Sequence, residues 1–342
     1  ELNVAWKPVI NGPPHLEAYE TVPFSYFFAA NHSIGEVKWD LWGGLPQGLR
    51  LVDQTLIGTP VESGEYRFTV RATESEGAFG ESRFVILINP APSIVTSEIP
   101  VARATVPYEA HLDVEGGAAN WVAGRRLPAG LQVLRDGMLV GRPAEPGSFD
   151  FTVSAVDEKS AKTTIRLHLD VEPGVKLGNL VPDLRQTVPV AHHFNVDGAR
   201  GEVIWTMKGD LPEGLTFSSG VLSGTPVDSG AFSATIRATD REGAFDEEEI
   251  QMFVVRAPSI ANANLPSARQ AEPYLARLRT RGTVEQVSWT VEGRLPPGLT
   301  VGDNKISGVP RQAGRWTFLL ICTDGEMARG GRELEIVVHE GW

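Results

Sequence analysis

The sequence predicts an all-β chain of four tandem β-sandwich domains that form an elongated rod. A five-residue motif, Leu-Pro-x-Gly-Leu, occurs four times at steps of 82 to 84 residues, beginning at Leu45, Leu127, Leu211 and Leu295. A fixed step of this kind is the sequence signature of a tandem array. Segments of alternating apolar and polar residues surround each copy, and no stretch has a helical period.

The motif is expected to be a turn that is anchored at both ends. In a type I turn, proline in the second position presets φ to about −65° and glycine in the fourth position relieves crowding. Leu45 and Leu49, which flank Pro46 and Gly48 in the first copy, would then point back into a core.

Every repeat has the same order of elements when the copies are aligned on this motif. A strand with period two, such as residues 108–114, comes first. Six residues before the motif stands a tryptophan that we expect to fill the core between two sheets: Trp39, Trp121, Trp205 or Trp289. A Gly-x-Pro turn, a strand such as residues 66–72 and a last strand such as residues 83–88 follow the motif. Six or seven short strands at a spacing of about 8 to 12 residues are typical of a β-sandwich.

Proline-containing linkers divide the chain into four predicted domains. We name them repeat 1 (residues 1–90), repeat 2 (residues 91–173), repeat 3 (residues 174–257) and repeat 4 (residues 258–342). The linkers are two or three residues long and stiffened by proline, so neighbouring repeats should not tumble freely. At about 3.3 Å per strand residue, four repeats end to end would make a rod on the order of 150 Å.

The composition is that of a folded protein and excludes several classes of partner. Hydrophobic residues make up 42% and charged residues 22% of the chain. The net charge of −12 disfavours nucleic acid and anionic membranes. Cys322 is the only cysteine, so an intrachain disulfide is impossible, and we expect its side chain to be buried. No apolar run is long enough to cross a membrane, which predicts a soluble chain without direct membrane insertion.

The combined pattern of Leu-Pro-x-Gly-Leu, Gly-Thr-Pro, a Gly-x-Tyr/Phe strand and an acidic turn resembles the bacterial putative immunoglobulin-like repeats, a family close to dystroglycan-type cadherin-like domains. The resemblance covers all four repeats, and repeat 2 departs most, with Arg142 in place of the threonine in Gly-Thr-Pro. It implies an immunoglobulin-like or cadherin-like sandwich. Surface adhesins, S-layer proteins, spacers of secreted enzymes and phage structural proteins all use this family.

An acidic turn follows the penultimate strand of each repeat, at Glu74, Asp157, Asp240 and Asp324. In repeat 3, Asp240, Glu242 and Asp246 together offer many carboxylate oxygens, and cadherin-like domains bind calcium between repeats. Calcium requires six to eight converging oxygens, but the linkers lack the acidic run that would complete such a cage and Arg241 lies inside the cluster. Calcium is the only cofactor considered, and the alternative is a solvated hairpin.

Repeat 1 differs from the other repeats by carrying extra aromatic residues. Trp42 aligns with Gly124, Lys208 and Glu292, and Phe27 aligns with His111, His193 and Arg277. Exposed aromatic residues often mark interaction sites, so Trp42, Phe27 and the nearby Trp6 are candidates for a binding surface. The alternative is that these side chains pack against residues 1–20.

The sequence carries one pair of adjacent histidines and lacks the common catalytic motifs. His192 and His193 lie on one strand, so their side chains face opposite ways, and we expect His192 to be a core residue with its hydrogen bonds satisfied. No Gly-x-Ser-x-Gly, His-Glu-x-x-His, phosphate-binding loop or Cys-x-x-Cys occurs. We therefore predict no catalytic residues and no enzymatic activity.

Three functions are compatible with these features. The first is a structural or adhesive module at the cell surface, extracellular, that contacts a protein or glycan surface through repeat 1. The second is a bacteriophage virion protein, such as a tail or head fibre or a decoration protein, that contacts neighbouring subunits. The third is a spacer region of a larger secreted enzyme.

Overall fold

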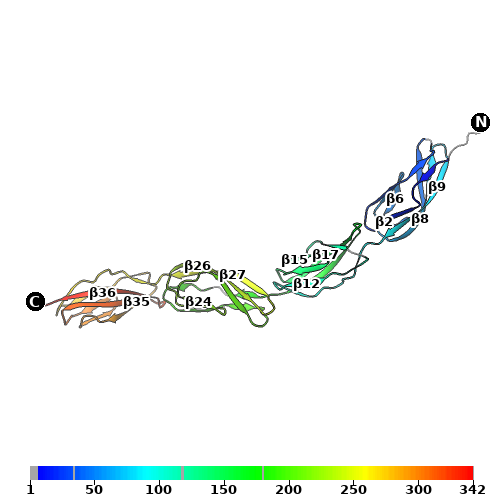
Figure 1. Ribbon diagram of the computed structural model, residues 1–342. Coiled ribbons are helices and arrows are strands. Elements are labelled where there is room, and N and C mark those ends of the chain that lie inside the picture. Colours follow the sequence, from blue (N-terminus) through cyan, green and yellow to red (C-terminus); the bar gives the residue numbers. More distant parts are fainter. Residues whose placement is uncertain (1–6, 34, 117–118, 179–180, 342) are drawn as a thin grey trace, which may run out of the picture. The chain divides into compact units, whose positions relative to one another are not determined.

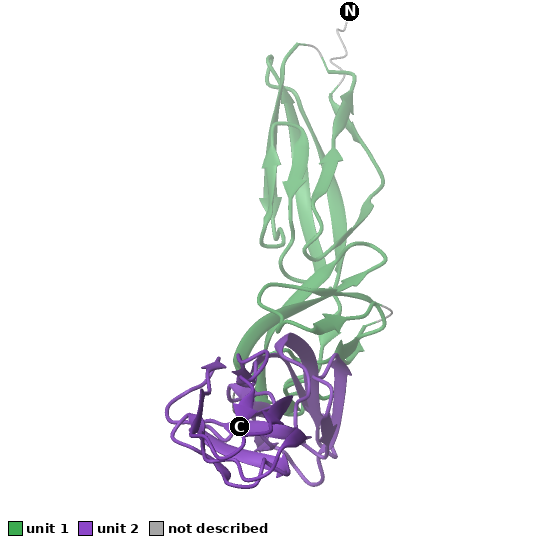
Figure 2. Cartoon of the chain, turned by 90° about the vertical axis from the view of Figure 1, so that its left-hand side faces the viewer, with its two compact units in different colours: residues 1–174 green, residues 175–342 purple. Residues whose placement is uncertain are grey.

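The computed structural model describes residues 7–33, 35–116, 119–178 and 181–341, and all of its regular elements are strands. The chain forms two compact units, residues 1–174 and residues 175–342 (Figure 2). In the described part of the chain, every sheet is built from strands of one unit. The all-β prediction is confirmed.

Each unit contains two copies of the same strand plan (Figure 1). In repeat 1 the strands are β1 (Val9–Asn11), β2 (His15–Tyr19), β3 (Phe24–Phe27), β4 (Ala29–Asn31), β5 (Val37–Gly43), β6 (Leu49–Val52), β7 (Thr55–Gly58), β8 (Gly64–Glu74) and β9 (Phe79–Asn89). In repeat 2 they are β10 (Ser93–Ile94), β11 (Ala102–Arg103), β12 (Tyr108–His111), β13 (Val114–Glu115), β14 (Ala119–Ala123), β15 (Leu131–Val133), β16 (Met138–Gly141), β17 (Gly147–Asp157) and β18 (Lys162–Glu172).

The second unit repeats this plan. In repeat 3 the strands are β19 (Lys176–Gly178), β20 (Leu184–Arg185), β21 (Val190–His193), β22 (Asn195–Asp197), β23 (Ile204–Gly209), β24 (Leu215–Ser218), β25 (Val221–Gly224), β26 (Gly230–Thr239) and β27 (Phe245–Val255). In repeat 4 they are β28 (Ser259–Ile260), β29 (Ala268–Arg269), β30 (Tyr274–Arg277), β31 (Thr280–Arg281), β32 (Ser288–Gly293), β33 (Leu299–Gly302), β34 (Lys305–Gly308), β35 (Gly314–Thr323) and β36 (Arg329–His339).

Two sheets form each sandwich. In repeat 1 the four-stranded sheet has the order β2-β9-β8-β5 and the three-stranded sheet the order β3-β7-β6, while β1 and β4 form a short separate pair. The long hairpin β8–β9 is antiparallel, whereas β2 runs parallel to β9. The other three repeats have the same strand orders, so the sequence prediction of a β-sandwich in each repeat is confirmed.

The Leu-Pro-x-Gly-Leu motif forms a turn, but not in the predicted register. The N–H of Leu49 donates to the carbonyl of Pro46 (3.2 Å), so proline is the first and glycine the third residue of the turn. Gly48 has φ +96°, the left-handed conformation that a type II turn requires at its third position. Glycine is therefore needed for its backbone conformation, and the other three copies have the same bond and a φ between +87° and +97°.

A second glycine contacts this turn directly. Gly58, in the Gly-Thr-Pro segment, lies so close to Gly48 that a Cβ atom on Gly58 would stand 1.9 Å from the Gly48 carbonyl oxygen. The N–H of Thr59 donates to that same oxygen (3.1 Å). The two recurring motifs of the sequence thus form one backbone-to-backbone contact.

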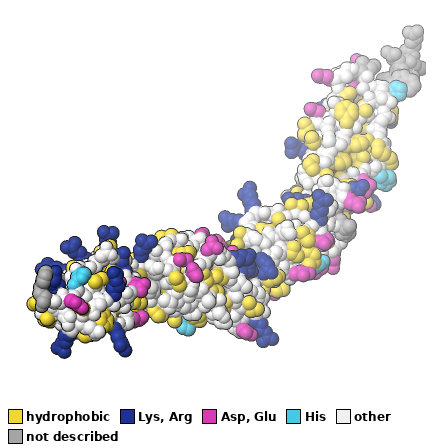
Figure 3. Space-filling view, turned by 60° about the vertical axis from the view of Figure 1, so that its left-hand side comes forward, with side chains coloured by type: hydrophobic (Ala, Val, Ile, Leu, Met, Phe, Trp, Pro, Cys, Tyr) yellow, Lys and Arg dark blue, Asp and Glu magenta, His cyan; other side chains and the backbone are white. Residues whose placement is uncertain are grey.

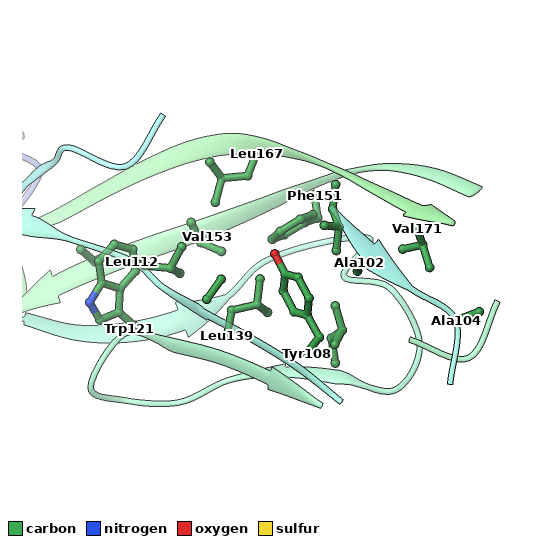
Figure 4. Close-up of a cluster of buried hydrophobic side chains, with 14 residues drawn as sticks. Ala102, Ala104, Tyr108, Leu112, Trp121, Leu139, Phe151, Val153, Leu167 and Val171 are labelled. Carbon is green, nitrogen blue, oxygen red and sulfur yellow. The ribbon is translucent and has the colours of Figure 1, made fainter. Parts of the chain in front are cut away.

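The inner faces of the two sheets enclose a separate hydrophobic core in each repeat. Figure 4 shows the core of repeat 2, where the Tyr108 ring lies among the apolar side chains and Trp121 stands at one end. The Tyr108 hydroxyl donates to the Pro100 carbonyl (2.7 Å), and burial raises the pKa of Tyr108 to about 12. The buried hydroxyl is therefore satisfied by a backbone carbonyl group, as a polar group in a core should be.

The four recurring tryptophans differ in how deeply they are placed. All four lie on the edge strand of a four-stranded sheet, but Trp121 is 4% exposed and belongs to the core, whereas Trp39, Trp205 and Trp289 are partly buried and pack against it. In repeat 4, Trp289 Nε1 donates to Asn304 Oδ1 (2.8 Å). The expectation of a central plug therefore describes Trp121 better than the other three.

Candidate functional site

The outer face of the four-stranded sheet of repeat 1 carries a cluster of aromatic and charged side chains, which we name the aromatic patch: Trp42, Arg71, Phe79 and Glu81. Trp42 lies on β5, Arg71 on β8, and Phe79 and Glu81 on β9. Trp42 is 42% and Phe79 is 47% exposed. Trp42 belongs to a strand, and it points outward because Trp39 and Leu41 take the inward phase.

Arg71 holds the aromatic patch together. Its Cζ atom lies 4.7 Å from the centroid of the Trp42 ring and 4.2 Å from that of Phe79. The guanidinium also pairs with Glu81, where Nε and Oε1 are 2.7 Å apart. A cation over an exposed ring contributes about 0.5–1 kcal/mol, so these contacts fix the two rings without burying them.

The outer face of the three-stranded sheet carries a second exposed surface, which we name the apolar patch: Phe27, Val52 and Ile57. Phe27 is 59% exposed and lies on β3, Val52 is at the end of β6, and Ile57 is on the central strand β7. The side chain of Thr55, which pairs with both Phe27 and Val52, lies between these two residues.

Phe27 and Trp42 do not belong to one surface. The two sheets pack face to face, and each residue lies on the outer face of a different sheet. Sequence proximity suggested a shared site, but the alternation of strands between sheets separates the two side chains. Trp6, the third candidate, lies outside the described residues.

Repeats 3 and 4 carry polar side chains at the register position of Trp42, and repeat 2 has Gly124 there. Trp42 pairs with Thr69, and in the equivalent pairs Lys208 faces Thr235 and Glu292 faces Leu319. Repeat 3 retains part of the cluster, since the Arg237 guanidinium lies 3.6 Å from the Phe245 ring centroid and pairs with Glu247. The feature that distinguishes repeat 1 is therefore the indole of Trp42.

The acidic residues of the metal candidate have structural partners. Asp240 is 3% exposed, and its Oδ1 accepts the N–H groups of Glu242 and Ala244, both at 3.0 Å. Its Oδ2 accepts the N–H of Arg200 (2.9 Å), so Asp240 closes the turn and ties it to a neighbouring loop.

The two other members of this candidate also bind within the protein. Glu242 pairs with Arg200 (3.2 Å), and Asp246 Oδ2 accepts the N–H of Leu177 (2.8 Å). Among the described residues, no group of three or more His, Cys, Asp or Glu side chains could hold a metal ion. The structure does not bring Asp240, Glu242 and Asp246 together as ligands, and Asp240 forms the turn of a hairpin but is buried rather than solvated.

On the face that Figure 3 shows, Lys and Arg side chains are prominent on the C-terminal part of the chain, Asp and Glu side chains are scattered over the surface, and hydrophobic side chains are exposed between the charged ones. The part of the chain that the structure describes includes no helix long and apolar enough to span a membrane.

Three hydrophobic residues of these surfaces, Phe79, Val52 and Ile57, were not predicted from the sequence, and neither was the Arg71–Glu81 pair. Phe79 belongs to the Gly-Ala-Phe segment that repeats 1 and 3 share. Only its contact with Arg71 in the structure shows that it is part of the aromatic patch. Val52 and Ile57 lie on strands that alternate normally, so only the comparison with Ser218 and Ser223, at the same register positions in repeat 3, would have indicated them.

Comparison with known proteins places the chain in a family. The family model described as "Putative Ig domain" matches residues 7–89, 90–172 and 181–256. No curated protein matches the sequence.

Solved structures with a similar fold are multidomain ectodomains. Human desmocollin-1 ectodomain is 10% identical, with 97% of this chain and 79% of that chain covered and a TM-score of 0.28. The N-terminal eight Ig domains of Down Syndrome Cell Adhesion Molecule are 15% identical, with 97% of this chain and 49% of that chain covered and a TM-score of 0.30. Immunoglobulin domains 1–5 of Sidekick-1 are 13% identical, with 98% and 81% covered and a TM-score of 0.26. The family match covers most of this chain, which therefore belongs to the Ig-like family described as "Putative Ig domain".

Proposed function

We propose that this chain is a non-enzymatic structural and adhesive module that acts outside the cell and contacts a protein or glycan surface through the aromatic patch of repeat 1. The observation that carries the proposal is the exposure of Trp42 on an outer sheet face, at a position where repeat 3 has lysine and repeat 4 has glutamate. Tryptophan and arginine are favoured anchors at interfaces. Membership of the Ig-like family supports the structural role but names no partner.

The aromatic patch is better prepared for a contact than the apolar patch. Arg71 and Glu81 neutralise each other, so a partner would meet rings that are already positioned rather than a charge that must be desolvated. In the apolar patch no charged pair among the described residues fixes Phe27, and exposed apolar side chains are common on protein surfaces.

The place where the protein acts is tested first. Immunogold electron microscopy with an antibody against the chain, on the producing cells and on phage particles that they release, separates the candidate settings. Label along the cell envelope is expected. Label confined to virions would replace this proposal with a fibre or decoration protein, and label that follows a longer secreted polypeptide would indicate a spacer.

The contact itself is tested with the full chain, labelled with a fluorophore, on the surface that the microscopy identifies. Trp42→Ala is expected to reduce bound protein at least about tenfold, since removing a hot-spot residue costs about 2 kcal/mol or more. Phe253→Ala, which removes a 56% exposed aromatic side chain from repeat 3, serves as the matched control. Equal loss in both variants, or none in either, would rule out the aromatic patch as the contact.

A further inference from the structure

Repeats 3 and 4 meet at a joint with a buried ion pair. Arg185 ends β20 of repeat 3, and Asp324 lies in the turn between β35 and β36 of repeat 4. The guanidinium Nη2 of Arg185 pairs with the carboxylate of Asp324, and the two side chains are only 9% and 0% exposed. Nη1 of Arg185 also pairs with Glu326 (2.6 Å), and Nη2 donates to the Gly282 carbonyl (3.2 Å). One arginine of repeat 3 thus holds three groups of repeat 4.

A threonine adds a second connection across the same joint. The Thr187 hydroxyl accepts the N–H of Arg329 (2.8 Å) and lies 3.3 Å from the Arg329 carbonyl oxygen, to which it can donate. Thr187 has φ +71°, which is unusual for a β-branched residue. Its own N–H donates to Pro226 (2.9 Å), so repeat 3 holds this conformation in place.

Polar contacts rather than apolar packing dominate the joint. A pocket of about 510 Å³ opens beside the ion pair, and its lining includes Val188, Val255 and Val284. These side chains border the open space of the pocket, whereas the Asp324 carboxylate is fully buried. A buried carboxylate that loses its cation is strongly unfavourable, so movement of repeat 4 away from Arg185 is resisted.

The corresponding joint between repeats 1 and 2 has only part of this arrangement. Thr21 has φ +64°, and its hydroxyl accepts the N–H of Lys162 (2.7 Å), just as Thr187 accepts that of Arg329. Tyr19 stands where repeat 3 has Arg185, at the end of the first strand of the four-stranded sheet. It brings no positive charge to Asp157, the counterpart of Asp324, and its hydroxyl donates to Glu17 (3.1 Å) instead.

We propose that the Arg185 ion pair and the Thr187 contact lock repeats 3 and 4 into one rigid pair, and that repeats 1 and 2 are joined more loosely. The cation of this joint is a side chain of the protein rather than a metal ion. The proposal does not depend on the aromatic patch or on any partner.

The test measures distance distributions between spin labels in the full chain by pulsed electron paramagnetic resonance. Thr216→Cys and Thr300→Cys report on the joint of repeats 3 and 4, and Arg50→Cys and Gln132→Cys on that of repeats 1 and 2. These four residues are exposed, each directly follows the last leucine of a Leu-Pro-x-Gly-Leu motif, and Cys322 is too buried to be labelled. We expect a narrower distribution for the first pair than for the second.

Arg185→Met should broaden the distribution of the first pair at least about twofold. Arg315→Met, which removes an exposed ion pair within repeat 4, is the matched control and should leave it unchanged. If Arg185→Met does not fold, Thr187→Val with Glu326→Gln removes the outer contacts and should also broaden the distribution. The proposal is overturned if Arg185→Met and the wild type give equally wide distance distributions. It is also overturned if the distribution between residues 216 and 300 is no narrower than that between residues 50 and 132. A change of width on adding a chelator would overturn it as well.

Discussion

At the scale of single residues, His192 is a titratable side chain whose Nε2 atom is buried. Its ring lies edge-on against Phe194, with centroids 4.8 Å apart, and among the described residues its Nε2 has no hydrogen-bond partner. Tyr26 occupies the same register position in repeat 1, edge-on to Phe28 at 5.1 Å. Burial lowers the pKa of His192 below its ordinary value, and the charge of His193 lowers it further.

Repeat 3 should therefore lose stability in mild acid. Because the pKa of His192 is lower in the folded than in the unfolded chain, the unfolded state binds more protons once the pH falls below about 6.5. His192→Phe, which keeps an aromatic ring against Phe194, is expected to reduce the fall in melting temperature between neutral and mildly acidic pH. An identical pH dependence in variant and wild type would contradict this expectation.

The exposure of a residue could be predicted from the sequence where the aligned residues of the other repeats are of a different type. Trp42 stood out because Lys208 and Glu292 take its place elsewhere, and its exposure agrees with that contrast. His192 faces inward, as the alternation of its strand predicts, but the expectation that its hydrogen bonds are satisfied is wrong, because its buried Nε2 has no partner among the described residues. Hydrogen bonding depends on which side chains of other strands arrive at the same place, and one sequence does not contain that information.

At the scale of elements, two glycines in each repeat decide the geometry of the three-stranded sheet. One belongs to the Leu-Pro-x-Gly-Leu motif and the other to the Gly-x-Pro turn that follows it. Gly224 has φ +130°, and a Cβ atom on it would lie 2.1 Å from the Gly214 carbonyl oxygen. Gly214 in turn occupies the third position of its turn with φ +88°. A side chain at either position would push the turn away from the strand that follows it.

Gly224→Ala is expected to destabilise repeat 3 by about 3 kcal/mol, because backbone strain and steric overlap add. Gly243→Ala is the matched control, since Gly243 also has a positive φ of +85° but a Cβ atom there would meet open space. Urea denaturation of the two variants separates the effects. A similar loss in both would show that conformational strain alone, rather than the close contact, sets the requirement for glycine.

The strands were predictable because alternation directly records which side chains face the core. The register of the turn was not, since Leu-Pro-x-Gly-Leu is compatible with proline in either of two turn positions and only the Leu49 to Pro46 hydrogen bond decides between them. The role of the acidic turn was left open between a cation site and a hairpin for a similar reason. A carboxylate that accepts backbone N–H groups, as Asp240 does, has the same sequence signature as one that could bind a cation.

At the scale of the whole molecule, the chain consists of two units that each close their own sheets. The motif spacing predicted the repeated fold, because each copy brings the same turn and the same strands. The exact domain boundaries and the rod remain predictions. Spacing alone also could not assign Phe27 and Trp42 to different faces, since that depends on how strands are distributed between the two sheets.

A fragment of residues 175–342 is expected to fold without the rest of the chain. It contains complete three- and four-stranded sheets and both of its hydrophobic cores. Circular dichroism should give a β spectrum and a cooperative thermal transition, and the amide resonances should be well dispersed. A disordered fragment would mean that the first unit is needed to fold the second.

The parallel pairing of the second and the last strand of each repeat has a consequence for tension. In repeat 1, β2 runs parallel to β9 over five residue pairs, from His15 with Val85 to Tyr19 with Asn89, whereas the corresponding ladder in each other repeat has two pairs. A pull on the two ends of a repeat would slide these strands along each other, so that the hydrogen bonds of the ladder must break together rather than one after another. The repeat that carries the proposed contact is therefore also the one built to resist the greatest force before it opens.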